Sequence, residues 1–169
     1  MHPLIALSLL LMLAAAQPAF AAPIDDANAA YQRGNYAAAE KILLPLADAG
    51  NAYAQYRLGL VYLEATGEMR SPEEGAKWLE SAALQGQPNA QYKLGILYVN
   101  GNGVSRDFVQ AYLWLTLSTR HIAGSGSEAV RQRDMLAARM SSSQIADAKK
   151  LVRDWRPMKF ETETPPPQR

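Results

Sequence analysis

The stretch AQYRLGLVY at residues 54–62 returns 36 residues later as AQYKLGILY at residues 90–98. Six of the nine positions are identical, and the other three exchange Arg for Lys, Leu for Ile and Val for Leu. Chance would match roughly one position in nine at ordinary composition. Self-similarity with a period of about 20–50 residues is typical of stacked-repeat architectures. The two stretches therefore predict a solenoid and favour a binding function over catalysis.

Between Asp25 and Trp155 the apolar residues follow a helical spacing, without an alternating strand-like run of useful length. Gly, Asn and Pro recur at short intervals and leave segments of natural helix length between them. We therefore predict an all-α fold of eight helices that pair into four antiparallel hairpins. The expected helices cover about residues 25–33, 36–49, 52–65, 72–85, 88–99, 106–120, 127–140 and 142–156.

Three serines mark expected helix starts. Ser71, Ser125 and Ser141 each precede a Glu or a Gln by three residues. In this arrangement the Ser oxygen accepts an unpaired backbone N–H, and the Glu or Gln side chain reaches back to the cap.

Gly59 and Gly95 stand inside expected helices, where Gly costs about 1 kcal/mol relative to Ala. Their recurrence indicates that a neighbouring helix crosses too closely there for a Cβ. Bulky residues of the second helices, including Trp78 and Trp114, are expected to fill the space around these small residues.

The N-terminus carries an apolar run, Leu4–Ala16, followed by the small-x-small sequence Ala19–Ala21. The run is shorter than the roughly 20 apolar residues that span a bilayer. The pattern predicts a signal peptide at residues 1–21; an uncleaved anchor or a buried helix is the alternative interpretation. The chain has no cysteine, so an exported form must rely on its core, which favours the bacterial periplasm.

The remainder reads as one domain at residues 22–156 and a tail at 157–169. The tail contains Pro165–Pro167 and is expected to be disordered, as a solvated terminus or as a proline-rich docking peptide. The formal net charge is +1, which gives no electrostatic signature of nucleic-acid binding.

Few residues offer catalytic or metal-binding chemistry. His121 is the one histidine after the signal peptide and is expected to cap a helix C-terminus. The pair Glu73-Glu74 falls in a first helical turn, where negative charge is stabilising. We therefore expect no catalytic residue, no metal site and no cofactor.

These residues resemble the Sel1-like repeat, a relative of the tetratricopeptide repeat. The second copy carries the similarity best, in both its helices and their loop, and the first copy departs from the pattern at Ala65 and at Glu68-Met69. Its loop also reads as one residue longer, because Gly67 to Ala76 spans nine positions and Gly103 to Ala111 spans eight. The resemblance covers roughly residues 25–155. The matching residues of the second copy are Ala90, Leu94, Gly95, Tyr98, Gly101, Gly103, Val104, Ala111 and Trp114.

The resemblance implies a right-handed α-superhelix that mediates protein–protein contacts. Matching to the tetratricopeptide pattern places eight side chains on its concave face. Tyr56 and Tyr92 would form an aromatic stripe there; the alternative is that both pack between repeats. The eight candidate partner-binding residues are Tyr53, Tyr56, Leu60, Glu64, Asn89, Tyr92, Ile96 and Asn100.

The sequence thus predicts a periplasmic, monomeric scaffold or adaptor that binds a protein or peptide and is not an enzyme. It leaves two alternatives open. One is an accessory component of an envelope secretion or stress-response assembly. The other, more remote, is an envelope hydrolase of the β-lactamase-like kind reported for some Sel1-like proteins; those examples are rich in cysteine, which this chain lacks.

Overall fold

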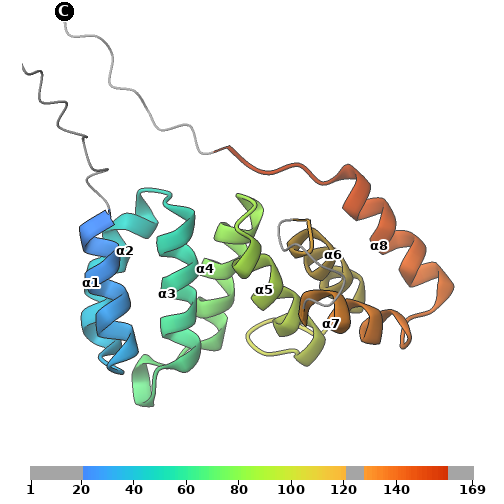
Figure 1. Cartoon of the computed structure of the whole chain (residues 1–169). Coiled ribbons are helices and arrows are strands. Elements are labelled where there is room, and N and C mark those ends of the chain that lie inside the picture. Colours follow the sequence, from blue (N-terminus) through green and yellow to red (C-terminus); the bar gives the residue numbers. More distant parts are fainter. Residues whose placement is uncertain (1–20, 121–127, 160–169) are drawn as a thin grey trace, which may run out of the picture.

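The computed structural model describes residues 21–120 and 128–159, and every regular element in this part of the chain is a helix. Figure 1 shows the helices following one another along the molecule, with α1 at one end and α8 at the other. The all-α prediction is confirmed; residues 1–20, His121 and residues 160–169 lie outside the described part. The elements are α1 (Ala21–Gln32), α2 (Tyr36–Asp48), α3 (Ala52–Glu64), the 3-10 turn η1 (Gly67–Met69), α4 (Pro72–Leu84), α5 (Pro88–Asn100), α6 (Phe108–Ser118), α7 (Glu128–Ala137) and α8 (Ser142–Asp154).

The 36-residue period sets the helix boundaries as well as the repeated stretch. The starts of α3 and α5, at Ala52 and Pro88, are 36 residues apart, and so are the starts of α4 and α6, at Pro72 and Phe108. The two loops therefore have equal length, and the expectation of a longer first loop is wrong. The error came from matching Ala76 to Ala111; the residue equivalent to Ala111 is Gly75.

Both helical glycines lie at close helix crossings, as expected. A Cβ at Gly59 would lie 2.7 Å from Cγ of Leu79, and a Cβ at Gly95 would lie 2.8 Å from Cγ of Leu115. Gly75 faces Gly59 across the first crossing, where its Cβ would lie 2.9 Å from the Gly59 carbonyl oxygen. The α3–α4 and α5–α6 hairpins are therefore packed through direct contact between a glycine backbone and a leucine side chain.

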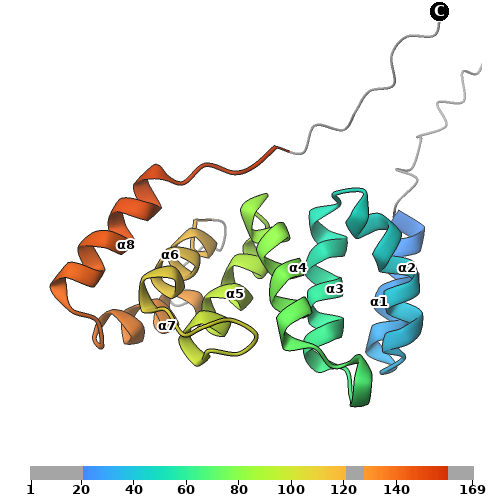
Figure 2. The same cartoon turned by 180° about the vertical axis from the view of Figure 1, so that it is seen from behind.

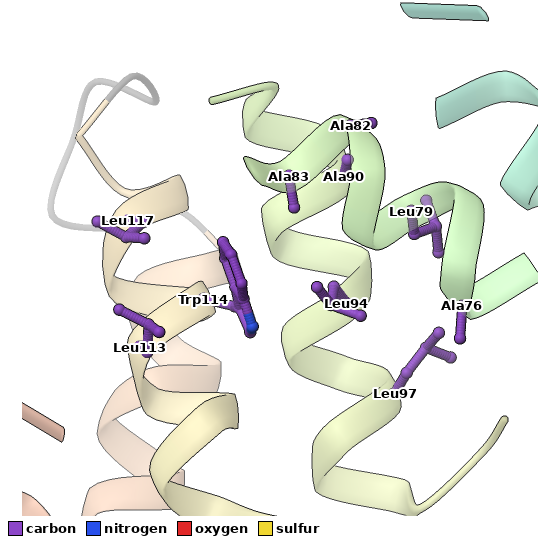
Figure 3. Close-up of a cluster of buried hydrophobic side chains, with 10 residues drawn as sticks. All are labelled: Ala76, Leu79, Ala82, Ala83, Ala90, Leu94, Leu97, Leu113, Trp114 and Leu117. Atoms are coloured by element: carbon purple, nitrogen blue, oxygen red, sulfur yellow. The ribbon is translucent and has the colours of Figure 1, made fainter. Parts of the chain in front are cut away.

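The core runs through the solenoid as successive clusters. One joins α1, α2 and α3, and the next joins α4, α5 and α6. Figure 3 shows Trp114 of α6 between α6 and α5, beside Leu94. Trp78 is its equivalent one repeat earlier and packs, half-buried, against the first cluster. The two tryptophans thus play the space-filling role expected of them.

Two of the three expected serine caps form, at Ser71 and Ser141, and one of them completes the reciprocal pattern; Ser125 lies outside the described residues. At α8 the Ser141 Oγ accepts the Gln144 N–H, and Gln144 accepts the Ser141 N–H at 2.9 Å. Ser71 also accepts the Glu74 N–H, yet its own N–H donates to the Tyr62 carbonyl. Glu74 therefore does not reach back to Ser71, and instead pairs with Lys77 at 2.6 Å.

The last two helices depart from the hairpin pattern. Both α7 and α8 pack against α6, whereas we expected them to pair chiefly with each other. The cause is the inner face of α8, where Ala148 is buried and Val152 and Trp155 pack on the α4–α6 cluster. Figure 2 shows α8 at the end of the solenoid, beyond α6.

The residues after α8 return toward α4. The Met158 N–H donates to the Leu84 carbonyl at 2.8 Å, and Trp155 and Pro157 lie over Gly86. We call residues 155–159 the strap. The tail expected from residue 157 therefore begins with an ordered contact to the solenoid.

Candidate partner-binding surface

The first helices of the repeats are positioned by equivalent side-chain bonds. Asn51 caps α3 by accepting the Ala54 N–H at 2.9 Å, and Gln87 caps α5 by accepting the Ala90 N–H at 2.6 Å. Each cap satisfies a backbone donor that has no partner within the helix. Helices α3 and α5 therefore begin at equivalent positions of the two repeats. We call the surface formed by α1, α3 and α5 the first-helix face.

A buried glutamine ties each of these helices to the helix before it. The Gln55 amide donates to the Ala47 carbonyl of α2 at 3.0 Å, and the Gln91 amide donates to the Ala83 carbonyl of α4 at 3.2 Å. The two glutamines are 3% and 1% exposed. Both glutamines lie within the repeated stretch. The sequence does not reveal that they bond to the preceding helix, because an exposed glutamine would fit the same spacing.

The junction of α1 and α3 holds a cluster of aromatic and charged side chains. The Arg57 guanidinium lies 4.3 Å from the ring centre of Tyr31, a cation–π geometry. The Tyr31 hydroxyl donates to the Glu64 carboxylate. Partial burial, followed by this bond and the nearby Glu64 charge, raises the pKa of Tyr31. Tyr31 and Arg57 were not among the candidate residues, since only the fold brings α1 beside α3.

Tyr53 and Tyr56 continue this cluster along α3. Their ring centres lie 6.0 Å apart at a tilt of 56°. Tyr53 is 38% exposed, whereas Tyr56 is half-buried and packs against the α4–α6 cluster. Desolvation raises the pKa of Tyr56 above its ordinary value. Tyr53 therefore presents its ring to solvent, and Tyr56 contributes partly to packing between repeats.

In the second repeat, Tyr92 and Ile96 pack against the cluster formed by α6 and α7. Both are half-buried. Burial raises the pKa of Tyr92, and the nearby Glu128 charge acts in the same direction. Both tyrosines of the expected stripe are thus shared between packing and surface, in agreement with the alternative left open by the sequence.

The other candidates divide by exposure. Leu60 is 4% exposed and offers a partner almost no surface, so the structure contradicts its predicted place in a partner site. Glu64, Asn89 and Asn100 are exposed. A partner on this face would meet Tyr53 and these polar side chains first.

Residues 21–120 and 128–159 contain no group of three or more His, Cys, Asp or Glu placed to hold a metal ion. Glu73 and Glu74 occupy the first turn of α4, as expected. No helix in the described part of the chain is long and apolar enough to cross a membrane.

A sequence model of the Sel1 repeat matches residues 52–87 and 88–121. The first interval starts with α3 and the second with α5, so the family boundaries coincide with the structural ones. The chain carries two Sel1 repeats. The resemblance inferred from the sequence is confirmed, and the Sel1 repeat is a scaffold fold generally used for protein interactions.

Two solved structures share this Sel1 architecture. A protective antigen present in uropathogenic Escherichia coli strains, which displays an SLR fold, matches with a TM-score of 0.73 and 26% identity over 82% of this chain. A Sel1 repeat protein from Oxalobacter formigenes matches with a TM-score of 0.55 and 27% identity over 85% of this chain. This chain spans 30% of the first protein and 67% of the second. No curated protein matches the sequence.

Proposed function

We propose that this chain is an exported interaction module that holds a protein or peptide partner on the first-helix face, which we take to be the concave face of the solenoid. The observation that carries the proposal is the Tyr53 ring, 38% exposed beside Tyr56 and the Arg57–Tyr31 pair. Tyrosine supplies apolar contact area and a polar tip, and it is enriched among residues that dominate binding energy.

Two features of the fold support this assignment. The α1–α3 cluster is tied across two helices through Tyr31, Arg57 and Glu64, so its aromatic surface is ordered before a partner arrives. Preorganised side chains lose less conformational entropy on binding. The Sel1 repeats supply the rigid stack on which these side chains stand.

Export is the second part of the proposal. It rests on the apolar run Leu4–Ala16 and the small-x-small sequence Ala19–Ala21. We propose that the exported module acts in a bacterial periplasm, as a monomeric scaffold without a catalytic role. N-terminal sequencing of the secreted chain should return Ala22. Recovery of Met1 from a membrane fraction would contradict the signal-peptide prediction.

Partner capture tests the binding surface. Tyr53→Ala combined with Asn89→Ala removes exposed side chains from both repeats on the first-helix face. The matched control, Lys77→Ala with Glu80→Ala, removes exposed side chains from α4 instead. We expect the first pair to reduce capture from periplasmic extract about tenfold or more, and the control pair to leave it unchanged. Equal capture by both variants would place the site elsewhere.

The double change of Tyr56 and Tyr92 to Ala is a weaker test than the sequence suggested. Both rings also pack between repeats, so the change would lower stability together with binding. Thermal unfolding must accompany any capture experiment with this variant.

A further inference from the structure

The basic residues of this chain gather toward its C-terminal end. Residues 21–119 contain seven Lys or Arg and ten Asp or Glu, whereas residues 120–159 contain nine and four. The net charge of +1 therefore conceals two regions of opposite sign. Such asymmetry along a chain points to an interaction with a charged surface.

Three of these cations share one flank of α8. At about 100° per residue, Lys149, Lys150 and Arg153 lie on the same side of the helix. Asp154 and Asp147 follow beyond Lys150, about 40° and 60° further round the helix, so the cationic side is bounded there by two carboxylates. The inner face, with Ala148 and Val152, is already occupied by packing on α6.

These cations are free to meet a ligand. Lys149, Lys150 and Arg153 are exposed, and none forms an ion pair within residues 21–120 and 128–159. Figures 1 and 2 show α8 at the end of the solenoid, with no described helix beyond it.

The strap carries two more exposed cations just after α8. Arg156 and Lys159 are exposed, and between them Met158 is 54% exposed although its backbone is fixed to Leu84. Arg120 reaches the same end of α8, because its guanidinium donates to the Val152 carbonyl at 3.0 Å. Arg120, Arg156 and Lys159 thus add three exposed cations near the C-terminal end of α8, together with the exposed Met158 side chain.

We propose that this surface, formed by α8 and the strap, docks the protein on an anionic lipid membrane. A cationic array on the outer side of a terminal helix suits a broad charged surface, and Met158 can enter the headgroup region between Arg156 and Lys159. Basic residues close to an anionic leaflet gain binding free energy that salt screens. An acidic polypeptide is the alternative occupant that the experiment separates.

Vesicle co-sedimentation of the exported chain beginning at Ala22, which lacks the apolar N-terminal run, tests the proposal. Vesicles of phosphatidylglycerol and phosphatidylethanolamine are compared with neutral phosphatidylcholine vesicles at low and high salt. We expect the unmodified chain to bind the anionic vesicles at least tenfold better at low salt, and to lose that advantage at high salt. Equal binding to both kinds of vesicle would overturn the proposal.

Variants of this chain with matched changes in charge locate the surface. Lys149→Glu, Lys150→Glu and Arg153→Glu together should abolish the preference for anionic vesicles, and the corresponding Gln changes should reduce it. The control changes three exposed cations elsewhere, Arg33, Lys41 and Arg70, to Glu. Equal losses in the α8 and control variants would overturn the proposal, as would binding to polyglutamate without binding to vesicles.

Discussion

Gly103 lies directly against the first turn of α4, where a Cβ at Gly103 would come within 2.1 Å of the Pro72 carbonyl oxygen. The loop between α5 and α6 thus rests on the helix of the preceding repeat. Gly67 is the equivalent residue of the first repeat, and a Cβ there would meet nothing within 4 Å. The same glycine therefore has a packing role in one repeat and not in the other.

This difference predicts unequal effects of alanine. Both glycines have a positive φ, 64° at Gly67 and 71° at Gly103, so both substitutions carry similar backbone strain. Only Gly103→Ala adds a backbone clash, and overpacking typically costs about 1–3 kcal/mol. Chemical denaturation should show Gly103→Ala to be the less stable variant by at least this amount. Equal stability of the two would refute the contact.

Gly95 and Leu115 predict a coupled pair. Gly95→Ala should destabilise the stack, because its Cβ would lie 2.8 Å from the Leu115 side chain. Leu115→Ala alone should cost about 2–5 kcal/mol through the cavity it leaves. The double variant should lose less than the sum of the two, since the new methyl group fills part of that space. Additive losses would show that the residues do not touch.

The two buried glutamines predict another asymmetry. Gln55 accepts a bond from Gln85 at 2.7 Å, whereas the Gln91 side-chain oxygen has no partner among the described residues. Changing Gln55 to Met removes two hydrogen bonds, one to the Ala47 carbonyl, which still accepts the Gly50 N–H, and one from the Gln85 amide. Each such bond contributes about 0.5–1.5 kcal/mol. Changing Gln91 to Met removes one hydrogen bond, to the Ala83 carbonyl, which still accepts the Gly86 N–H at 2.9 Å, and it also removes an unsatisfied oxygen. The Gln55 variant should therefore have the lower thermal midpoint; the opposite order would contradict the assigned bonds.

These residues show how far the sequence could go. The repeated stretch predicted the helices, the family and the glycine crossings because those depend on local spacing. Leu60 was predicted to bind a partner but is buried, because its position along the helix does not reveal what covers the side chain. The cation–π pair of Arg57 and Tyr31 forms only because α1 lies beside α3. Helix α8 packs on α6 only because its inner face, extended by Trp155, contacts the α4–α6 cluster. Such contacts join helices that are separate in the sequence, so the spacing of residues within one repeat cannot predict them.

Alkaline pH should weaken the fold through its tyrosines. Burial and the 2.5 Å hydrogen bond to Glu40 raise the pKa of Tyr62 to about 12, against about 10 in an unfolded chain. The folded state thus holds the phenol proton more tightly, and this contribution is complete below pH 10 and lost as pH rises toward 12. Thermal midpoints of Tyr62→Phe should fall less steeply across that window than those of the unmodified chain. Parallel curves would show that the Tyr62–Glu40 bond does not contribute.

Site-specific photocrosslinking tests the central claim, that the first-helix face holds the partner. A benzoylphenylalanine side chain is placed at Tyr53 or Asn89 on this face, and at Lys77 or Glu80 of α4 as controls, all of them exposed positions. Irradiation in the periplasm should give a crosslinked adduct of one defined mass from Tyr53 and Asn89 and none from Lys77 and Glu80. The same adduct from the α4 positions, with none from Tyr53 and Asn89, would contradict the account.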